Sequence, residues 1–159
     1  MGKLGELKAS FDQVVEEHRE LQRMIQELRG YLERPQAQLT DATSHVWASV
    51  LAQQLVQLHD RLFVNFREEE QAGILDELAR EFPRASRAVD RLRDEHGEVL
   101  VEVREILGAA MTCAEDKPPP GPSVTGRAMG LLDRLDRHER KETDLIERLY
   151  CEDLGGEHY

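Results

Sequence analysis

The chain has 159 residues and a formal net charge of −11 at pH 7; 33% of its residues are charged and 5% are aromatic. This length suffices for one domain with a substantial core, which we expect to span residues 1–159 with its core over 4–150. The acidic excess argues against nucleic acid and against an anionic membrane surface as partners, because both require a basic face. No stretch reaches the ~18 apolar residues of a membrane span.

Two further features indicate the compartment. The N-terminal stretch lacks the apolar segment of a signal peptide. The two cysteines, Cys113 and Cys151, are expected to be free thiols in a reducing environment. We therefore predict a cytoplasmic protein.

Three loop signals divide the chain into helices. They are ERPQAQLTDATS at 33–44, with Asp41 or Ser44 as a candidate N-cap, REFPRAS around Pro83, and EDKPPPGPSVTG with its four prolines. These breaks predict helices over 3–33, 45–80, 84–113 and 125–153. Short connections between long amphipathic helices favour antiparallel neighbours, so the predicted fold class is all-α, an up-down-up-down four-helix bundle.

An apolar seam follows each predicted helix in alternating steps of three and four residues. Polar residues interrupt every seam. Without partners they would each cost several kcal/mol on burial, in a fold stable by only about 5–15 kcal/mol. We therefore expect them to be satisfied together. The interrupting residues are His18, Asn65, Glu69, His96, His138 and Glu142.

The spacing along the helices predicts that these residues share one layer near mid-helix. At a rise of about 1.5 Å per residue, Glu69 lies about a dozen residues before the Pro83 turn, and His96 lies about a dozen after it. His138 matches His96 across the third loop in the same way. The first connection fits only if the second helix or its first turn overshoots the first helix by about one turn.

Histidine and carboxylate side chains at one level of a bundle indicate a metal site, and this donor set suits iron, manganese or zinc. The pairs His138/Glu142 and Asn65/Glu69 each have the i, i+4 spacing that places both side chains on one helix face. The Glu-x-x-His motif of ferritin-like proteins is absent, because Arg93 and Leu135 stand three residues before the two histidines.

Four motifs in chain order resemble the hemerythrin-like (HHE cation-binding) family. EEHRELQRMI is similar to the family's first-helix histidine motif, and NFREEE to its His-Phe-x-x-Glu-Glu element with Asn65 in place of the histidine. LRDEHGEVLVEV resembles the third-helix Glu-His motif, and HERKETDL the fourth-helix histidine with a carboxylate four residues on.

The resemblance implies a di-iron centre. Glu69 and Glu142 would bridge two irons, His96 and His138 would bind one of them, and His18 would bind the other with whatever Asn65 can offer. The expected cofactor is two iron ions, or a single one; manganese and zinc are alternatives. The family's members bind or sense dioxygen, handle iron, or respond to nitric oxide and oxidants.

Two departures from the family pattern lower the number of nitrogen ligands. Asn65 offers only a weak neutral carbonyl or a hydrogen bond to a metal-bound water, and Leu100 stands where the oxygen carriers have a second third-helix histidine. Both weaken the case for reversible oxygen carriage and for a full His18 site. Glu68 is the nearest residue that could replace Asn65, although Glu68 and Glu70 are expected to be solvated or to support the ligands.

Three functions follow from this reading. The favoured one is a non-haem iron protein that binds or senses dioxygen or another small diatomic ligand or oxidant, or handles iron, rather than an enzyme. The second is a di-metal oxidase or peroxidase, because carboxylate-rich sites favour oxygen activation. The third is a metal-poor bundle that acts through contacts with an unidentified protein.

Overall fold

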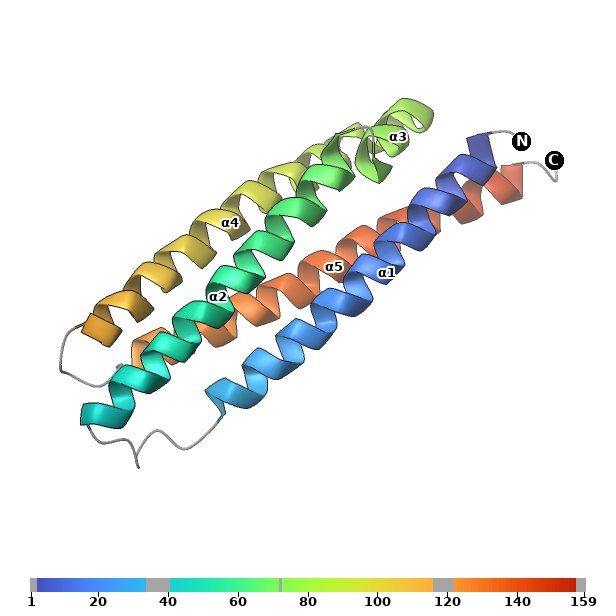
Figure 1. The fold of residues 1–159 in the computed structure, drawn as a ribbon. Coiled ribbons are helices and arrows are strands. Elements are labelled where there is room, and N and C mark those ends of the chain that lie inside the picture. Colours follow the sequence, from blue (N-terminus) through green and yellow to red (C-terminus); the bar gives the residue numbers. More distant parts are fainter. Residues whose placement is uncertain (1–2, 34–40, 72, 116–121, 157–159) are drawn as a thin grey trace.

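The four expected long helices are present in the computed structural model (Figure 1). It describes residues 3–33, 41–71, 73–115 and 122–156, with side chains over 5–33, 43–71, 73–115 and 124–151. No strand occurs in these ranges, so the prediction of an all-α bundle is confirmed. The elements are α1 (Lys3–Leu32), α2 (Asp41–Glu70), α3 (Ile74–Glu81), the 3-10 helix η2 (Pro83–Ala85), α4 (Ser86–Glu115) and α5 (Pro122–Gly156).

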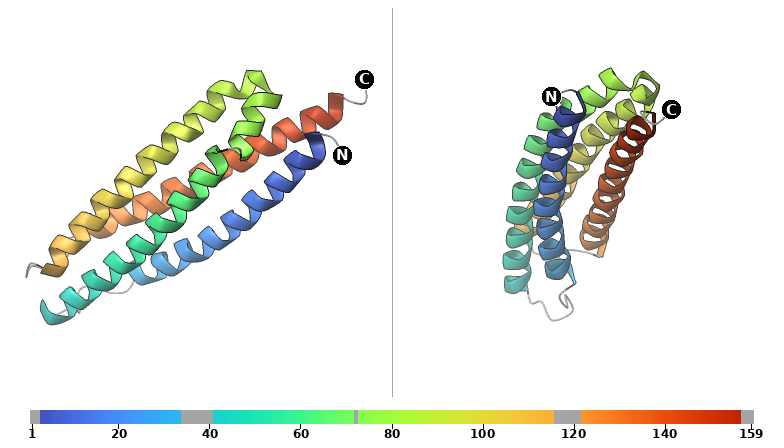
Figure 2. Two further views of the ribbon diagram at one scale, coloured as in Figure 1. Left: turned by 45° about the horizontal axis from the view of Figure 1, so that its top comes forward. Right: turned by 90° about the vertical axis from the view of Figure 1, so that its right-hand side faces the viewer.

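The long helices run antiparallel to their neighbours, and the two ends of the chain lie at the same end of the bundle (Figures 1 and 2). α2 packs between α1 and α4, and α5 packs between α4 and α1. This is the predicted up-down-up-down order. Among the described helices, none has an apolar stretch long enough to cross a membrane.

The predicted seams face the interior. Every seam residue with a described side chain is buried, except Phe11 and His18, which are partly buried. Leu4 and Ala72, at which the steps of three and four residues begin the first seam and end the second, lie outside the described side chains. The buried seam residues that are apolar include Leu21, Ile25 and Leu28 of α1, Leu51, Leu55, Leu58 and Leu62 of α2, Val99, Val103 and Ile106 of α4, and Leu131, Leu135 and Leu149 of α5.

The prediction of one continuous second helix over 45–80 is wrong. α2 begins earlier, at Asp41, so neither Asp41 nor Ser44 precedes the helix, and it ends at Glu70. A Cβ at Gly73 would lie 1.9 Å from the backbone oxygen of Glu68, so the chain turns here on a residue without a side chain. The loop signals that divided the sequence into helices did not include this single glycine.

α3 takes the place of the last turns of that predicted helix. It contacts α1, α2 and α4 and buries Ile74, Leu75 and Leu78 at the end of the bundle (Figure 2). Glu69 is therefore the second-last residue of α2 and does not lie near mid-helix. α2 also extends beyond α1 at the opposite end of the bundle. Asn65 lies 24 residues after the first residue of α2, whereas His18 lies only 14 residues before the last residue of α1. From the polar layer to this end, α2 is therefore longer than α1 by about 15 Å. The expected overshoot is thus present and is larger than one turn.

Gly73→Ala is expected to lower the free energy of unfolding by about 2–3 kcal/mol, because its methyl group would collide with the α2 backbone. Gly130→Ala in α5 is the matched control, since a Cβ there meets nothing within 4 Å. That change should stabilise the helix by about 0.5–1 kcal/mol. Urea denaturation of both variants measures the difference, and equal effects would contradict a steric role for Gly73.

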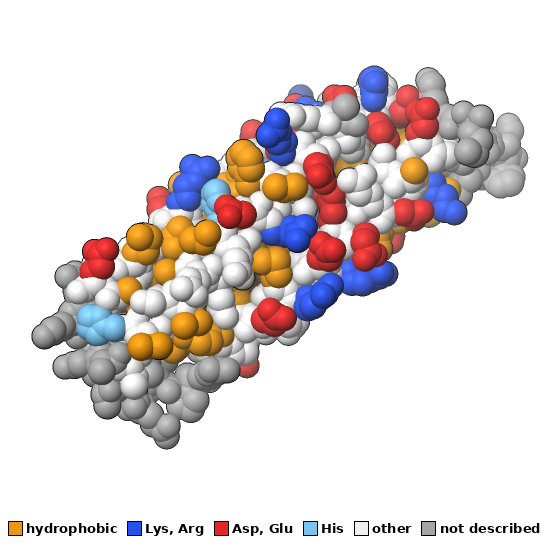
Figure 3. Space-filling model, in the orientation of Figure 1, with side chains coloured by type: hydrophobic (Ala, Val, Ile, Leu, Met, Phe, Trp, Pro, Cys, Tyr) orange, Lys and Arg blue, Asp and Glu red, His pale blue; other side chains and the backbone are white. Residues whose placement is uncertain are grey.

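The polar layer separates two apolar clusters. One cluster includes Leu21, Leu62, Val99 and Leu135, and the other includes Val14, Leu92 and Leu145 together with α3. Outside, the face drawn in Figure 3 carries acidic and basic side chains mainly over its upper right half, and most of its apolar side chains gather over the lower left half. The histidine and carboxylate side chains of the layer therefore lie between two blocks of core, at a level where a soluble bundle otherwise places leucine.

Candidate metal centre

Five of the six predicted residues converge in two groups of potential ligands. The first group is His96, His138 and Glu142, and the second is His18, Glu69 and Glu142. Within each group, one ligand-type atom of every residue lies within 4.8 Å of the others. Two ligand atoms each about 2.0–2.3 Å from one cation lie at most about 4.6 Å apart, so both groups are close to the dimensions of a metal site.

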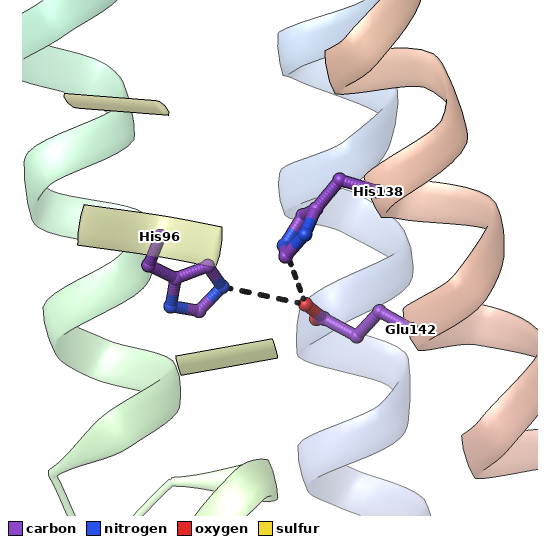
Figure 4. Close-up of side chains that lie close together, drawn as sticks. All are labelled: His96, His138 and Glu142. Atoms are coloured by element: carbon purple, nitrogen blue, oxygen red, sulfur yellow. Dashed lines mark ion pairs between the residues drawn. The ribbon is translucent and has the colours of Figure 1, made fainter. Parts of the chain in front are cut away.

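Glu142 is the residue common to both groups, and none of it is exposed. Figure 4 shows the rings of His96 and His138 directed at its carboxylate. Their Nε2 atoms lie 3.7 Å and 3.4 Å from Oε2. The Nε2 atom of His18 lies 3.6 Å from Oε1, on the other carboxylate oxygen. The two oxygens of Glu142 therefore face different histidines.

Glu69 links the groups from the α2 side. Glu69 belongs to the second group, with His18. Its Oε2 atom nevertheless lies 3.3 Å from Nε2 of His96, which belongs to the first group. Glu69 and Glu142 thus both lie between the histidines of the two groups. This placement suits the bridging role that the family resemblance implies, and that role stays a prediction.

Asn65 lies on α2 one turn before Glu69 and belongs to neither group. Its side chain is buried, with 3% exposed, and its Nδ2 atom has no hydrogen-bond partner. The second group therefore has one nitrogen ligand, whereas the first has two. Glu68, the suggested replacement, is exposed and lies in neither group.

Two further carboxylates hold the histidine rings from behind. Glu95 Oε1 lies 2.7 Å from Nδ1 of His138, and Glu70 Oε2 lies 3.1 Å from Nδ1 of His96. An ionised carboxylate only accepts hydrogen bonds, so each Nδ1 carries a proton, and Nε2 is the ring nitrogen that faces the layer and is available to a cation. Glu70 fits the predicted supporting role. Glu95 was not identified from the sequence, although it directly precedes His96.

Phe66 forms an apolar wall beside these rings. Its ring stacks on His96 with centroids 3.8 Å apart and an angle of 4°, and it meets the edge of His138 at 5.6 Å. Phe66 is 4% exposed and also belongs to the larger apolar cluster. The only sequence signal for Phe66 was its place in the NFREEE motif, because it lies off the seam.

The pKa values of Glu69 and Glu142 are shifted in opposite directions. Burial raises the pKa of Glu69 well above its ordinary value, and the charge of Glu142 adds to the effect. Burial acts in the same direction on Glu142, but its interactions with His138, His18 and His96 outweigh burial and hold its pKa well below the ordinary value. Without a cation, Glu142 therefore keeps its charge, whereas burial favours the protonated form of Glu69. A cation bound at Glu69 would favour its ionised form.

The donor atoms of the layer lack hydrogen-bond partners. They are Glu69 Oε2, His96 Nε2, His138 Nε2 and both carboxylate oxygens of Glu142, and all are buried. An unsatisfied buried polar group costs about 1–3 kcal/mol, more when charged. Five such atoms directed at one another are well suited to bind cations, and their mixture of imidazole and carboxylate fits iron, manganese or zinc. The residues present therefore fit the implied metal centre.

The fold and this layer together define a helical-bundle protein of the cation-binding class. The family model for the hemerythrin HHE cation-binding domain matches residues 9–150. The chain therefore belongs to that family, as its motifs indicated. Neither the curated proteins nor the solved structures gave a match.

Glu95→Gln is expected to weaken cation binding by about 10–100-fold, because the amide could donate to His138 and no longer fixes the proton on Nδ1. The matched control is Glu102→Gln on the same helix, where the carboxylate pairs with Arg134 and does not contact the layer. Isothermal titration of metal-free protein with Mn²⁺ measures both affinities. Equal affinities of the two variants would exclude a supporting role for Glu95.

Proposed function

We propose that this protein is a non-haem di-iron protein that binds or senses dioxygen or a related small oxidant, or handles iron, in the cytoplasm. The observation that carries the proposal is the pair of ligand groups that share Glu142, whose buried donor atoms have no hydrogen-bond partners. The family assignment supports cation binding at this layer. Binding or sensing is favoured over catalysis.

Each side chain has a separate task in this proposal. His96, His138 and Glu142 would hold one iron, and His18, Glu69 and Glu142 the other. Iron bound there would supply a redox-active centre that can accept a small ligand. Asn65 contributes no charge and leaves the second group with fewer nitrogen ligands, and its Nδ2–H is a free donor for a small ligand bound nearby.

The surroundings keep water away from the first group. Phe66 covers the rings of His96 and His138, and apolar residues close the bundle above and below the layer. His18 is more open, with 14% of its side chain exposed. We infer that a small ligand approaches the second group, which is both more accessible and poorer in nitrogen ligands.

A di-metal oxidase or peroxidase is the second candidate, and one observation on the donor set supports it. The layer offers two glutamates and three histidines, and Asn65 replaces a further histidine expected from the family. Carboxylate oxygen suits harder, more oxidised metal ions than imidazole does. Reductant-dependent turnover of peroxide or nitric oxide well above that of free iron would select this candidate.

The proposal is tested by metal content per chain in protein expressed with added iron, together with the visible absorption spectrum and the melting temperature with and without Fe(II). About two irons with oxo-bridge absorption is the expected result. About one iron would restrict the centre to the first group. A folded protein with no metal and no change in melting temperature would overturn the proposal and favour a bundle that acts through protein contacts.

A further inference from the structure

Four of the five proposed ligands are too deeply buried to take up a cation directly from water. His96, His138, Glu142 and Glu69 are all at most 4% exposed. Two cavities reach a ligand from the surface. One lies between α1 and α2 and is lined by Glu69, and the other lies between α1 and α5 and is lined by His18.

The α1–α2 cavity has a volume of about 310 Å³, enough for several waters. Three carboxylates, Glu17, Glu68 and Glu69, line it, and its described lining contains no lysine or arginine. Their burial increases toward the metal layer, because Glu68 is exposed, Glu17 is half-buried and Glu69 is 4% exposed. A hydrated cation would therefore meet carboxylates of decreasing solvent exposure.

The inner carboxylates have free oxygen atoms. Glu17 Oε2 and Glu69 Oε2 are both buried and have no hydrogen-bond partner. Glu17 and Glu68 are held side by side by Gln13, whose Nε2 atom donates to Glu17 Oε1 at 3.2 Å and to Glu68 Oε2 at 3.4 Å. Glu17 belongs to neither ligand group, so it lies outside the centre itself.

The other cavity is less suited to a cation. It has a volume of about 450 Å³, but Arg140 lines it, and its Asp136 is already paired with Arg29 at 2.7 Å. Glu139 there accepts a hydrogen bond from Gln22 at 3.0 Å. This second cavity serves as the comparison in the test below, because it also leads to a proposed ligand, His18, and contains a buried carboxylate, Glu139.

We propose that Glu68 and Glu17 form a cation-uptake site between α1 and α2, which passes a divalent metal ion to Glu69 and so to the second ligand group. This inference rests on the proposed function. In it, Glu68 binds the ion at the surface, Glu17 replaces part of its water, and Glu69 is the first permanent ligand. Glu17 and Glu68 act on the rate of loading and not on the final occupancy.

The test is stopped-flow mixing of metal-free protein with Co²⁺, followed by the visible absorption of the bound ion, with the final cobalt content determined by elemental analysis. Glu17→Gln and the Glu17→Gln/Glu68→Gln double variant are compared with Glu139→Gln in the other cavity and Glu16→Gln on the exposed face of α1. The expected result is at least a fivefold slower uptake for Glu17→Gln, slower still for the double variant, with unchanged final cobalt content and unchanged rates in both comparison variants.

Each other outcome has a defined meaning. Wild-type protein that binds no cobalt would refute the proposed function. A wild-type rate in the double variant, or slower uptake in Glu139→Gln alone, would overturn the uptake site. A lower final cobalt content in Glu17→Gln would also overturn it, because Glu17 would then be a ligand of the centre. Circular dichroism of each variant confirms that rates are compared between folded proteins.

Discussion

Glu142→Gln is expected to abolish binding at both ligand groups, the largest effect of any single substitution in the layer. Its two oxygens face His18 on one side and His96 and His138 on the other. The amide keeps the volume of the side chain but loses the charge and one acceptor. At a free metal concentration one hundred times the dissociation constant, binding stabilises the wild-type fold by about 2.7 kcal/mol. The melting temperature should therefore rise by about 5–10 °C with Fe(II) in wild type and stay constant in the variant.

Glu147→Gln is the control for this prediction. It makes the same chemical change on the same helix at an exposed position. We expect its metal content and its rise in melting temperature to match the wild type. His138→Ala removes a ligand from the first group only, so it should bind less metal and be less stable. If Glu142→Gln retained two metals, Glu142 would not be shared between the groups.

Asn65→His is expected to tighten metal binding at the second group by about tenfold or more, equivalent to about 1.4 kcal/mol, so that this group fills at a lower metal concentration than in the wild type. Position 65 is buried one turn before Glu69, and its Nδ2 atom has no partner. An imidazole there would restore the nitrogen ligand that the family pattern contains. Metal titration monitored by elemental analysis measures the change.

Phe63→His separates this effect from the simple addition of a histidine. Phe63 lies on the same helix but is 46% exposed and faces away from the layer, so its replacement should leave metal content unchanged. A wild-type stoichiometry and affinity in Asn65→His would mean that position 65 does not reach the second group. The two variants together thus test the placement of α2 relative to the centre.

The arrangement of the polar layer was predictable because helix geometry is local. A helix with 3.6 residues per turn shows its buried face in its own sequence, so the polar interruptions were visible without any tertiary information. Antiparallel packing then brings residues at similar distances from a turn to one level. This reasoning placed His18, Glu69, His96, His138 and Glu142 together, although the distance of Glu69 from its turn was counted through a helix that in fact ends at Glu70.

The sequence by itself determined the four long helices, their buried faces and the layer of potential ligands. Only the tertiary structure decided the rest. The clash that makes Gly73 a turn involves the backbone of Glu68, and α3 is held at the end of the bundle by contacts with three other helices. Two further features also depend on contacts between helices. Glu95 of α4 pairs with His138 of α5. The carboxylates whose burial increases toward the layer come from α1 (Glu17) and from α2 (Glu68 and Glu69). Such contacts depend on the distance and rotation between helices, which the pattern within one helix does not contain.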